Sequence, residues 1–303
     1  MWSSHYTTVT AKTLTINHDV EEIFSTGLVK IAFDYPYLLH VLLALGALHL
    51  DHLGGHSRAG DLDYLHQAEQ HHDAALTDFQ ANVRDIDDQN YKAVLMFAGT
   101  LFPYSCAMST AANTNLDHAF SSLFSNLLLT RRVRPMVVGV YEAMKRSELG
   151  KLIPIELTTI DWTTKESPVE TELTQLRKFS EVVHHVYPPD IVDAYGHAIH
   201  MLELLFEVAN NSQKPPSDTL LKIWMHFVTD RYVELLSEKQ PGSLIIFAHY
   251  AVILRRSEHY WFLEGVAEQI LKVADILVPT EWSKWLDWPK EQIRGERIFH
   301  TPD

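Results

Sequence analysis

The chain has 303 residues, of which 46% are hydrophobic and 21% charged, and its formal net charge at pH 7 is −14. A chain of this length and apolar content can bury a large core, and the scarcity of glycine and proline leaves little material for hairpin turns. The negative charge would repel a phosphate backbone, so we expect no direct nucleic acid binding by this chain. The single cysteine, Cys106, excludes an internal disulfide and any multi-cysteine metal cluster.

The beginning of the chain predicts neither export nor a membrane span. Residues 1–6 lack a basic segment followed by an apolar core, so we expect no signal peptide. Residues 37–50 are apolar but include His40 and His49, and the stretch is shorter than the roughly 20 residues that cross a bilayer. We therefore expect a core helix here, and an intracellular protein that is nuclear or cytoplasmic.

The first predicted long helix follows Asp34, which can act as its cap. Pro36 falls in the first turn and Gly54-Gly55 stops the helix. His49 and His52 lie near its end, where a protonated imidazole would suit the negative end of the helix dipole.

Two more helices are expected in the first third of the chain. Asp61 opens one whose apolar residues recur at three- and four-residue spacing up to Phe79. The acidic run 85–90 caps the next, an apolar central helix from Tyr91 to about residue 108. Pro103 lies inside that helix and predicts a kink or a break.

The remaining helices are separated by proline-rich breaks, and residues 151–170 are expected to form a long surface loop. Further helices are predicted at about 117–130, 134–149, 171–187, 190–210, 217–238, 242–256 and 260–277. The fold class is therefore all-α, with one domain over residues 1–303 built as a bundle of about ten to twelve helices.

Motifs for metal or nucleotide chemistry are weak in this sequence. Two Glu-x-x-His steps, Glu69 to His72 and Glu181 to His184, have the spacing used in di-iron bundles. A chain with 18 histidines and this many glutamates contains about one such step by chance, so we predict no metal site. We likewise predict no metal site at His197, His200 and Glu203, which lie on one face of a predicted helix. No nucleophile elbow, dinucleotide fingerprint or P-loop is present, and no cofactor is expected.

Aromatic and thioether side chains on the central helices predict an apolar ligand pocket. Its candidate walls are Phe97, Phe102, Met108, Trp224, Phe227, Phe247 and Trp261. Tyr104 and Tyr250 could contribute hydroxyl groups to it, and His249 is the candidate polar anchor. The alternative is that these side chains simply fill the core. Trp282, Trp285 and Trp288 are interpreted as core packing rather than as a ligand cage.

Four segments carry a resemblance to a known family. They are Ala32 to His40, Ala47 to Leu50, Ala248 to Ala251 and Trp282 to Pro289. In order and spacing they resemble the regulatory, ligand-binding domain of fungal zinc binuclear cluster transcription factors of the sterol-uptake-control type. The resemblance implies an all-helical domain that accepts a sterol in a hydrophobic pocket. The cysteine cluster of such factors is absent, so we expect either an excised portion of a regulator or a free-standing descendant.

Three functions follow as hypotheses. The first is a domain that binds an apolar sterol- or terpenoid-like small molecule. The alternative is a cofactor-independent cyclase, pericyclase or isomerase of fungal terpenoid or polyketide metabolism, which would use the same pocket to orient a substrate. His249, Tyr250 and Tyr104 would then polarise a carbonyl of the substrate. The third is an interaction scaffold, and a homodimer or a protein partner is possible in each case.

Overall fold

The computed structural model describes residues 2–54, 63–111, 120–121, 124, 128, 131, 139–153, 160–212 and 215–295. Within these residues the regular structure is helical and contains no strand, which confirms the predicted all-α fold. In chain order the elements are α1 (Trp2–Thr8), η1 (Thr10–Thr13), α2 (His18–Glu22), η2 (Ile23–Gly27), α3 (Leu28–Ala32), α4 (Pro36–His52), α5 (Tyr64–Asn82), α6 (Tyr91–Ala111), α8 (Tyr141–Arg146), η3 (Glu148–Leu152), α9 (Thr174–Val186), α10 (Pro189–Asn211), α11 (Asp218–Phe227), α12 (Asp230–Ser237), α13 (Pro241–Arg256), η5 (Trp261–Leu263), α14 (Val266–Leu277), η6 (Thr280–Leu286) and α15 (Asp287–Arg294).

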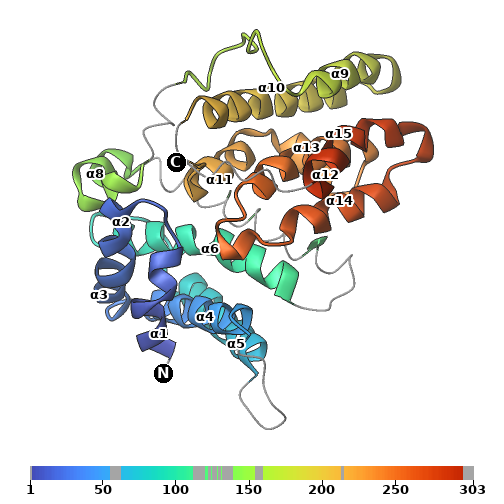
Figure 1. The fold of residues 1–303 in the computed structure, drawn as a ribbon. Coiled ribbons are helices and arrows are strands. Elements are labelled where there is room, and N and C mark those ends of the chain that lie inside the picture. The colour runs from blue at the N-terminus through green and yellow to red at the C-terminus, as the bar shows by residue number, and fades with distance from the viewer. Residues whose placement is uncertain are drawn as a thin grey trace, which may run out of the picture.

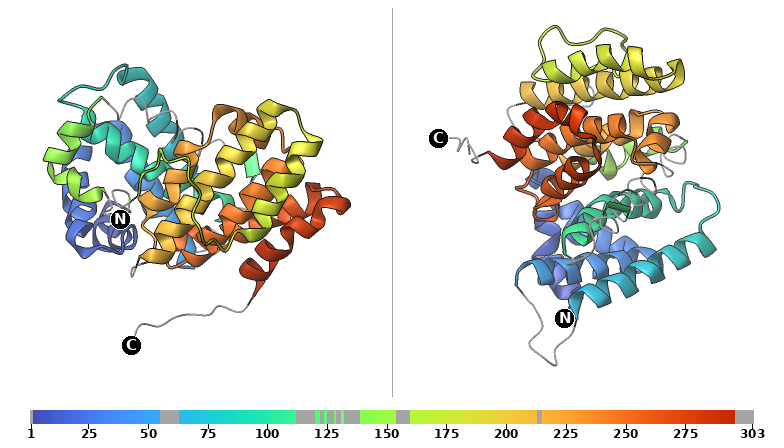
Figure 2. Two further views of the ribbon diagram at one scale, coloured as in Figure 1. Left: turned by 90° about the horizontal axis from the view of Figure 1, so that it is seen from above. Right: turned by 90° about the vertical axis from the view of Figure 1, so that its right-hand side faces the viewer.

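The helices are stacked in layers, as the right-hand view of Figure 2 shows. Helices α9 and α10 form one outer layer, the C-terminal group α11 to α15 lies beneath them, and α4 packs along α5 on the opposite side. Helix α6 runs between the N-terminal and C-terminal groups (Figure 1) and contacts α4, η5 and α14. Residues from both ends of the chain therefore meet along α6.

Helix α4 begins differently from the prediction. Asp34 is not its cap, because Tyr35 occupies the capping position and offers no side-chain hydrogen bond. The free N–H of Tyr37 instead donates to a carboxylate oxygen of Asp78 on α5, at 2.9 Å. A neighbouring helix thus satisfies the donor that a local cap would otherwise take. The predicted stop is confirmed, since Gly54 adopts a positive φ of 82° just after the helix.

The caps of the next two helices follow from short polar side chains. Asp63 accepts a hydrogen bond from the N–H of His66 and caps α5, whereas Asp61, the predicted opening residue, lies outside the described residues. Asp87 accepts from the N–H groups of Gln89 and Asn90 at 2.8 and 2.9 Å, just before α6. The acidic run therefore has the capping role that the sequence predicts.

Helix α6 continues through Pro103, so of the two predicted outcomes, a kink or a break, the break does not occur. Hydroxyl groups of the helix form hydrogen bonds with its own backbone carbonyls. Thr100 donates to the Phe97 carbonyl at 2.6 Å, and Ser109 donates to the Cys106 carbonyl at 2.8 Å. Burial in the middle of the molecule also opposes a break, because a freed backbone group there would meet no water. In length and apolarity α6 could cross a membrane, yet 78% of that stretch is buried in the protein, as in a core helix.

Two predicted helices are each divided in two. The helix predicted at 217–238 is broken after Phe227, because Thr229 caps α12 by accepting from the N–H of Tyr232. The helix predicted at 260–277 consists of the short η5 and then α14, with Gly265 at a φ of 79° between them. Both breaks occur at residue types with a strong preference for helix ends.

The other predictions agree in position where the structure describes them. Helices α9, α10 and α13 each begin and end within three residues of the predicted bounds. Most of the predicted helix 117–130 lies outside the described residues, and within 134–149 the described α-helix is α8 alone.

Candidate functional site

Two of the predicted wall residues, Trp224 and Phe247, form one compact aromatic group with Tyr250 in the core. The Trp224 ring stacks on Tyr250 with 4.6 Å between centroids and on Phe247 with 6.3 Å. The Trp224 indole N–H donates to the Ala198 carbonyl, and the Tyr250 hydroxyl donates to the Leu221 carbonyl, each at 2.9 Å. The three rings are almost fully buried, so they fill this part of the interior with their own contacts.

The other predicted wall residues are distributed over separate contacts. Phe97 stacks on Phe79, Phe102 meets Phe262 edge to face, and Phe227 stacks on Trp162. Met108 is half-buried and packs against the core. The structure thus brings only part of the predicted set together.

The proposed polar residues are also engaged in packing. Tyr104 stacks face to face on His72 at 3.8 Å, and burial raises the pKa of Tyr104. His249 stacks on Trp288 at 5.4 Å, and its Nδ1 donates to the Ile245 carbonyl at 2.8 Å. Burial lowers the pKa of His249 to about 4, so its ring is neutral at pH 7. Trp282 and Trp285 pack edge-on against Phe179, as the core interpretation predicts.

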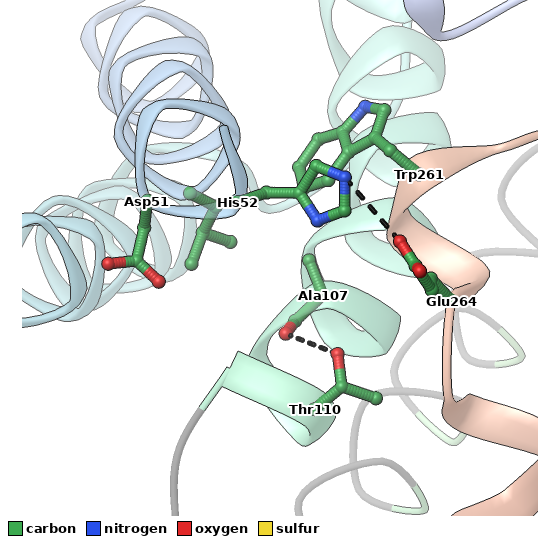
Figure 3. A pocket seen from close by; sticks show the side chains of 7 residues that line it. Asp51, His52, Ala107, Thr110, Trp261 and Glu264 are labelled. Atoms are coloured by element: carbon green, nitrogen blue, oxygen red, sulfur yellow. Dashed lines mark hydrogen bonds and ion pairs between the residues drawn. The ribbon is translucent and has the colours of Figure 1, made fainter. Parts of the chain in front are cut away.

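Trp261, one of the predicted wall residues, borders a pocket, shown in Figure 3. The pocket has a volume of about 290 Å³. Its described lining residues are Leu48, Asp51, His52, Ala107, Thr110, Trp261 and Glu264. They come from three segments that are far apart in the chain: the end of α4, the end of α6, and η5 with the residue after it.

The wall formed by η5 is held in place by turns and by one cross-chain bond. Gly265 takes a left-handed conformation that a side chain would strain, and this turn leads from Glu264 into α14. The Gln269 side chain donates to the Ser109 carbonyl at 2.5 Å and so joins α14 to the end of α6. The pocket is therefore framed by helix ends rather than by the faces of packed helices.

His49 lies behind the pocket and connects it to the N-terminal helix. Its Nδ1 forms a 3.0 Å hydrogen bond with the Thr10 hydroxyl, and its ring lies 4.8 Å from Trp261 and 5.3 Å from His5. Burial, together with the neighbouring His5 and His52, lowers the pKa of His49 to about 4. The expected imidazolium at this helix end is thus wrong for His49, because the desolvation cost of a charged ring outweighs the attraction of the dipole.

The pocket has a polar side as well as an apolar wall. Leu48 and Ala107 are buried, whereas His52 and Glu264 are exposed at the rim. The His52 ring lies 5.4 Å from the Trp261 ring, and its Nε2 lies 3.7 Å from a Glu264 carboxylate oxygen. Asp51 stands on the opposite side of His52 from Glu264 (Figure 3).

The histidine and glutamate stripes have partners within the protein. His197 contacts the Phe227 carbonyl and His200 the Thr164 carbonyl, at 2.9 and 2.8 Å, and the buried Glu203 pairs with Arg177. No group of three or more potential metal ligands comes together among the described residues.

The sequence identified Trp261 but not the six residues around it. The sequence predicts His52 only as a helix-end residue, and Asp51, Ala107, Thr110 and Glu264 carry no motif. A usable signal exists in principle, because three apolar segments end in short polar runs. That pattern does not reveal that the three ends meet.

Comparisons with known proteins agree with the resemblance found in the sequence. Residues 2–133 match the fungal specific transcription factor domain. The chain is 24% identical over 263 residues to "Sterol uptake control protein 2" of Saccharomyces cerevisiae, an alignment that covers 84% of this chain and 27% of that protein. It is 23% identical over 304 residues to a "Zn(2)-C6 fungal-type transcription factor" of Gibberella zeae, covering 94% of this chain and 59% of the relative. The chain thus spans between about a quarter and three fifths of the length of these relatives.

Proposed function

We propose that this fungal transcription-factor-like regulatory domain binds an apolar small molecule of the sterol or terpenoid class in the pocket beside Trp261. In this proposal the chain senses the molecule and does not contact nucleic acid itself, in keeping with its net charge of −14. We expect it in the nucleus or the cytoplasm, where a transcriptional regulator acts.

The observation that carries the proposal is the position of the pocket. Leu48 comes from α4 in the N-terminal group, Ala107 from the intervening α6 and Trp261 from the C-terminal group, so a bound molecule would touch both parts of the fold. A ligand that contacts two groups of helices can stabilise one arrangement of them over another, which is what a sensor requires. The printed name of the yeast relative, a sterol uptake control protein, favours sterols as the ligand class.

The size of the pocket sets a limit on the guest. A volume of about 290 Å³ lies at the lower end of the roughly 300–1,000 Å³ of typical small-molecule sites. It suits a compact terpenoid, or one end of a sterol ring system with the remainder at the mouth of the pocket.

The cyclase alternative gains no support from the residues that were assigned to it. The Tyr250 hydroxyl and the His249 Nδ1 both donate to backbone carbonyls inside the core. Neither residue lines the pocket beside Trp261, and nor does Tyr104. A group that polarises a substrate carbonyl must reach it, so a substrate in this pocket would gain no help from these three residues.

Binding can be tested by titrating the purified chain with ergosterol and with the bicyclic diterpene sclareol in a calorimeter. We expect micromolar binding of at least one. The Ala107→Leu variant fills the pocket and should weaken that binding at least about tenfold, because the added carbons occupy the space of the guest. Ala81→Leu is the matched control, since Ala81 is exposed near the far end of α5.

Two results would contradict the proposal. One is the absence of binding for both compounds, and the other is a loss of affinity that is equal in the two variants. After incubation the ligand is recovered and analysed by mass spectrometry and chromatography. Unchanged ligand agrees with a sensor, whereas a ring-closed product would revive the cyclase hypothesis.

A further inference from the structure

The segment that leads into α9 carries a serine that faces solvent and precedes a proline. Residues 161–173 form no helix and run over the outer layer of the fold beside α9 and α10 (Figure 1). Ser167 is exposed, whereas Pro168 is buried against the protein. The residue before a proline is biased toward extended backbone, the conformation in which protein kinases bind the residues around an acceptor serine. The Ser167 hydroxyl is thus presented in a form that a proline-directed kinase can use.

The surroundings of Ser167 distinguish it more than the dipeptide does. A serine or threonine before a proline is common by chance, and the sequence holds a second such step, Thr301-Pro302, outside the described residues. The dipeptide alone therefore selects neither position. Ser167 differs because two basic side chains of the outer layer, Arg177 on α9 and His200 on α10, bind the short segment around it.

His200 already forms a hydrogen bond with the Ser167 side chain. Its Nε2 lies 2.8 Å from the Thr164 carbonyl oxygen. A carbonyl oxygen only accepts, so Nε2 carries a proton. Nδ1 of the neutral ring then accepts from the Ser167 hydroxyl at 3.1 Å. A phosphate dianion on this serine would favour the cationic imidazole, which donates from both nitrogens and so keeps the contact.

Arg177 binds the same segment one residue further along. Its Nη2 donates to the Pro168 carbonyl, and its Nε donates to a carboxylate oxygen of the buried Glu203. The guanidinium has five N–H donors, and those on Nη1 are used in neither bond. Neighbouring Cα atoms are about 3.8 Å apart, so a phosphate on Ser167 lies within reach of this guanidinium. Arg177 can therefore donate to the phosphate while Glu203 keeps its partner.

We propose that Ser167 is a phosphorylation site for a proline-directed protein kinase, and that His200 and Arg177 bind the phosphoryl group. In the reaction the Ser167 Oγ attacks the γ-phosphorus of Mg-ATP, and the new Oγ–P bond replaces the bond to the leaving ADP. A carboxylate of the kinase takes the hydroxyl proton. The product adds a charge of about −1.5 to −2 at pH 7. Charge-assisted hydrogen bonds to two helices then hold residues 161–173 on the outer layer.

The site is separate from the pocket beside Trp261, because none of its residues lines that pocket. The modification is tested on the full chain with Mg-ATP and a mitogen-activated protein kinase, after a standard Ser-Pro substrate has shown that the kinase is active. Thr301→Val removes the other step of this kind. In this variant we expect about one phosphate per chain by intact mass, assigned to Ser167 by fragmentation. Adding Ser167→Ala should abolish it.

Two results would overturn the modification site. One is incorporation below about a tenth of a phosphate per chain in Thr301→Val. The other is incorporation that persists when Ser167→Ala is added, because the acceptor would then lie elsewhere.

Hydrogen exchange of backbone amides then tests the two groups that bind the phosphate. In residues 161–173 we expect exchange about three- to tenfold slower after phosphorylation, because opening of the segment must break the new bonds. His200→Gln should remove about half of this slowing or more. Arg177→Met combined with Glu203→Gln should do the same, and it leaves no buried carboxylate without a cation. His185→Gln is the matched control, because His185 is exposed on α9.

The exchange rates are compared within each variant, with and without the phosphate, and circular dichroism verifies that each variant is folded. Exchange that is unchanged or faster after phosphorylation of the wild type would overturn the binding of the phosphate by His200 and Arg177. Equal slowing in all the chains would assign the phosphate to other groups and refute the same claim. Neither result depends on whether a guest binds in the pocket, so failure here leaves the proposed function untouched.

Discussion

The pH dependence of stability tests whether His249 is buried as a neutral ring in the core. Protonating that ring would disfavour the folded state. The residue is 1% exposed, and burial lowers its pKa from 6.5 to about 4. The unfolded chain therefore binds a proton at this residue more readily than the folded chain does. The stability that the folded state gains from the neutral ring is complete above pH 6.5 and is lost as the pH falls from 6.5 to 4. Between pH 8 and pH 5 the loss is about 2 kcal/mol for one such histidine.

His49 and His72 behave in the same way, since burial lowers the pKa of each to about 4. The three histidines together remove about 6 kcal/mol between pH 8 and pH 5, a large part of the roughly 5–15 kcal/mol that stabilises a typical domain. We expect the protein to unfold near pH 5, where an ordinary helical domain would remain folded.

The variant His249→Phe isolates one of these contributions. Phenylalanine keeps an aromatic ring against Trp288 and removes the imidazole Nε2, which has no hydrogen-bond partner. At pH 8 we expect its free energy of unfolding to lie within about 1 kcal/mol of the wild type, because one side-chain hydrogen bond to Ile245 is lost while an unsatisfied buried nitrogen is removed. At pH 5 the variant should be about 2 kcal/mol more stable than the wild type.

Urea unfolding followed by circular dichroism at pH 8, 6.5 and 5, at constant ionic strength, measures the difference. His185→Gln serves as the control, since this exposed residue on α9 has similar surroundings in the folded and unfolded chain. Parallel losses of stability in the wild type and in His249→Phe would refute the argument, because they would mean that His249 is not the group that resists protonation.

Three further substitutions test individual contacts by the same unfolding assay. Tyr250→Phe leaves the Leu221 carbonyl without its side-chain donor and should cost about 1–2 kcal/mol, whereas no change would mean that water takes the place of the hydroxyl. Arg177→Met removes the cation that pairs with Glu203, which is 2% exposed, and should lower the free energy of unfolding by about 2–4 kcal/mol. Adding Glu203→Gln should restore most of that stability. Gly265→Ala forces a side chain into a left-handed turn and should cost about 1–2 kcal/mol; a neutral result would show that the turn can rearrange.

Much of the fold could be predicted because the residues that start or stop a helix lie next to its ends in the sequence. Pro241 opens α13 and Gly54 follows the end of α4, as the proline and glycine preferences indicate. The failures involve forces from outside the segment. Asp78, 41 residues from Tyr37, accepts the helix-start hydrogen bond expected of Asp34. Of the kink or break predicted at Pro103, the break is absent, because burial of α6 opposes it.

The site was less predictable for a related reason. Aromatic residues signal a cavity and a filled core equally well, and Trp224 and Tyr250 fill the space by stacking on each other. Trp261 differs because it lies on a short element between two helices and borders the pocket. The residues opposite it, Leu48 and Ala107, are more than 150 positions away in the chain, a distance that periodicity does not bridge.

The position of the pocket also separates function from stability. Side chains on the packed faces of helices contact neighbours on several sides, so changes at His249 or Tyr250 should appear first as altered unfolding energies. Of the pocket carboxylates, Asp51 lies at the end of α4 and Glu264 follows η5, and removing the charge of these partly exposed groups should cost little stability. Both residues line the space that a guest would occupy, so binding should respond to them more than stability does. If Asp51→Asn and Glu264→Gln lowered the free energy of unfolding as much as Tyr250→Phe does, these carboxylates would be structural supports, and the assignment of this pocket as the sensing site would lose its basis.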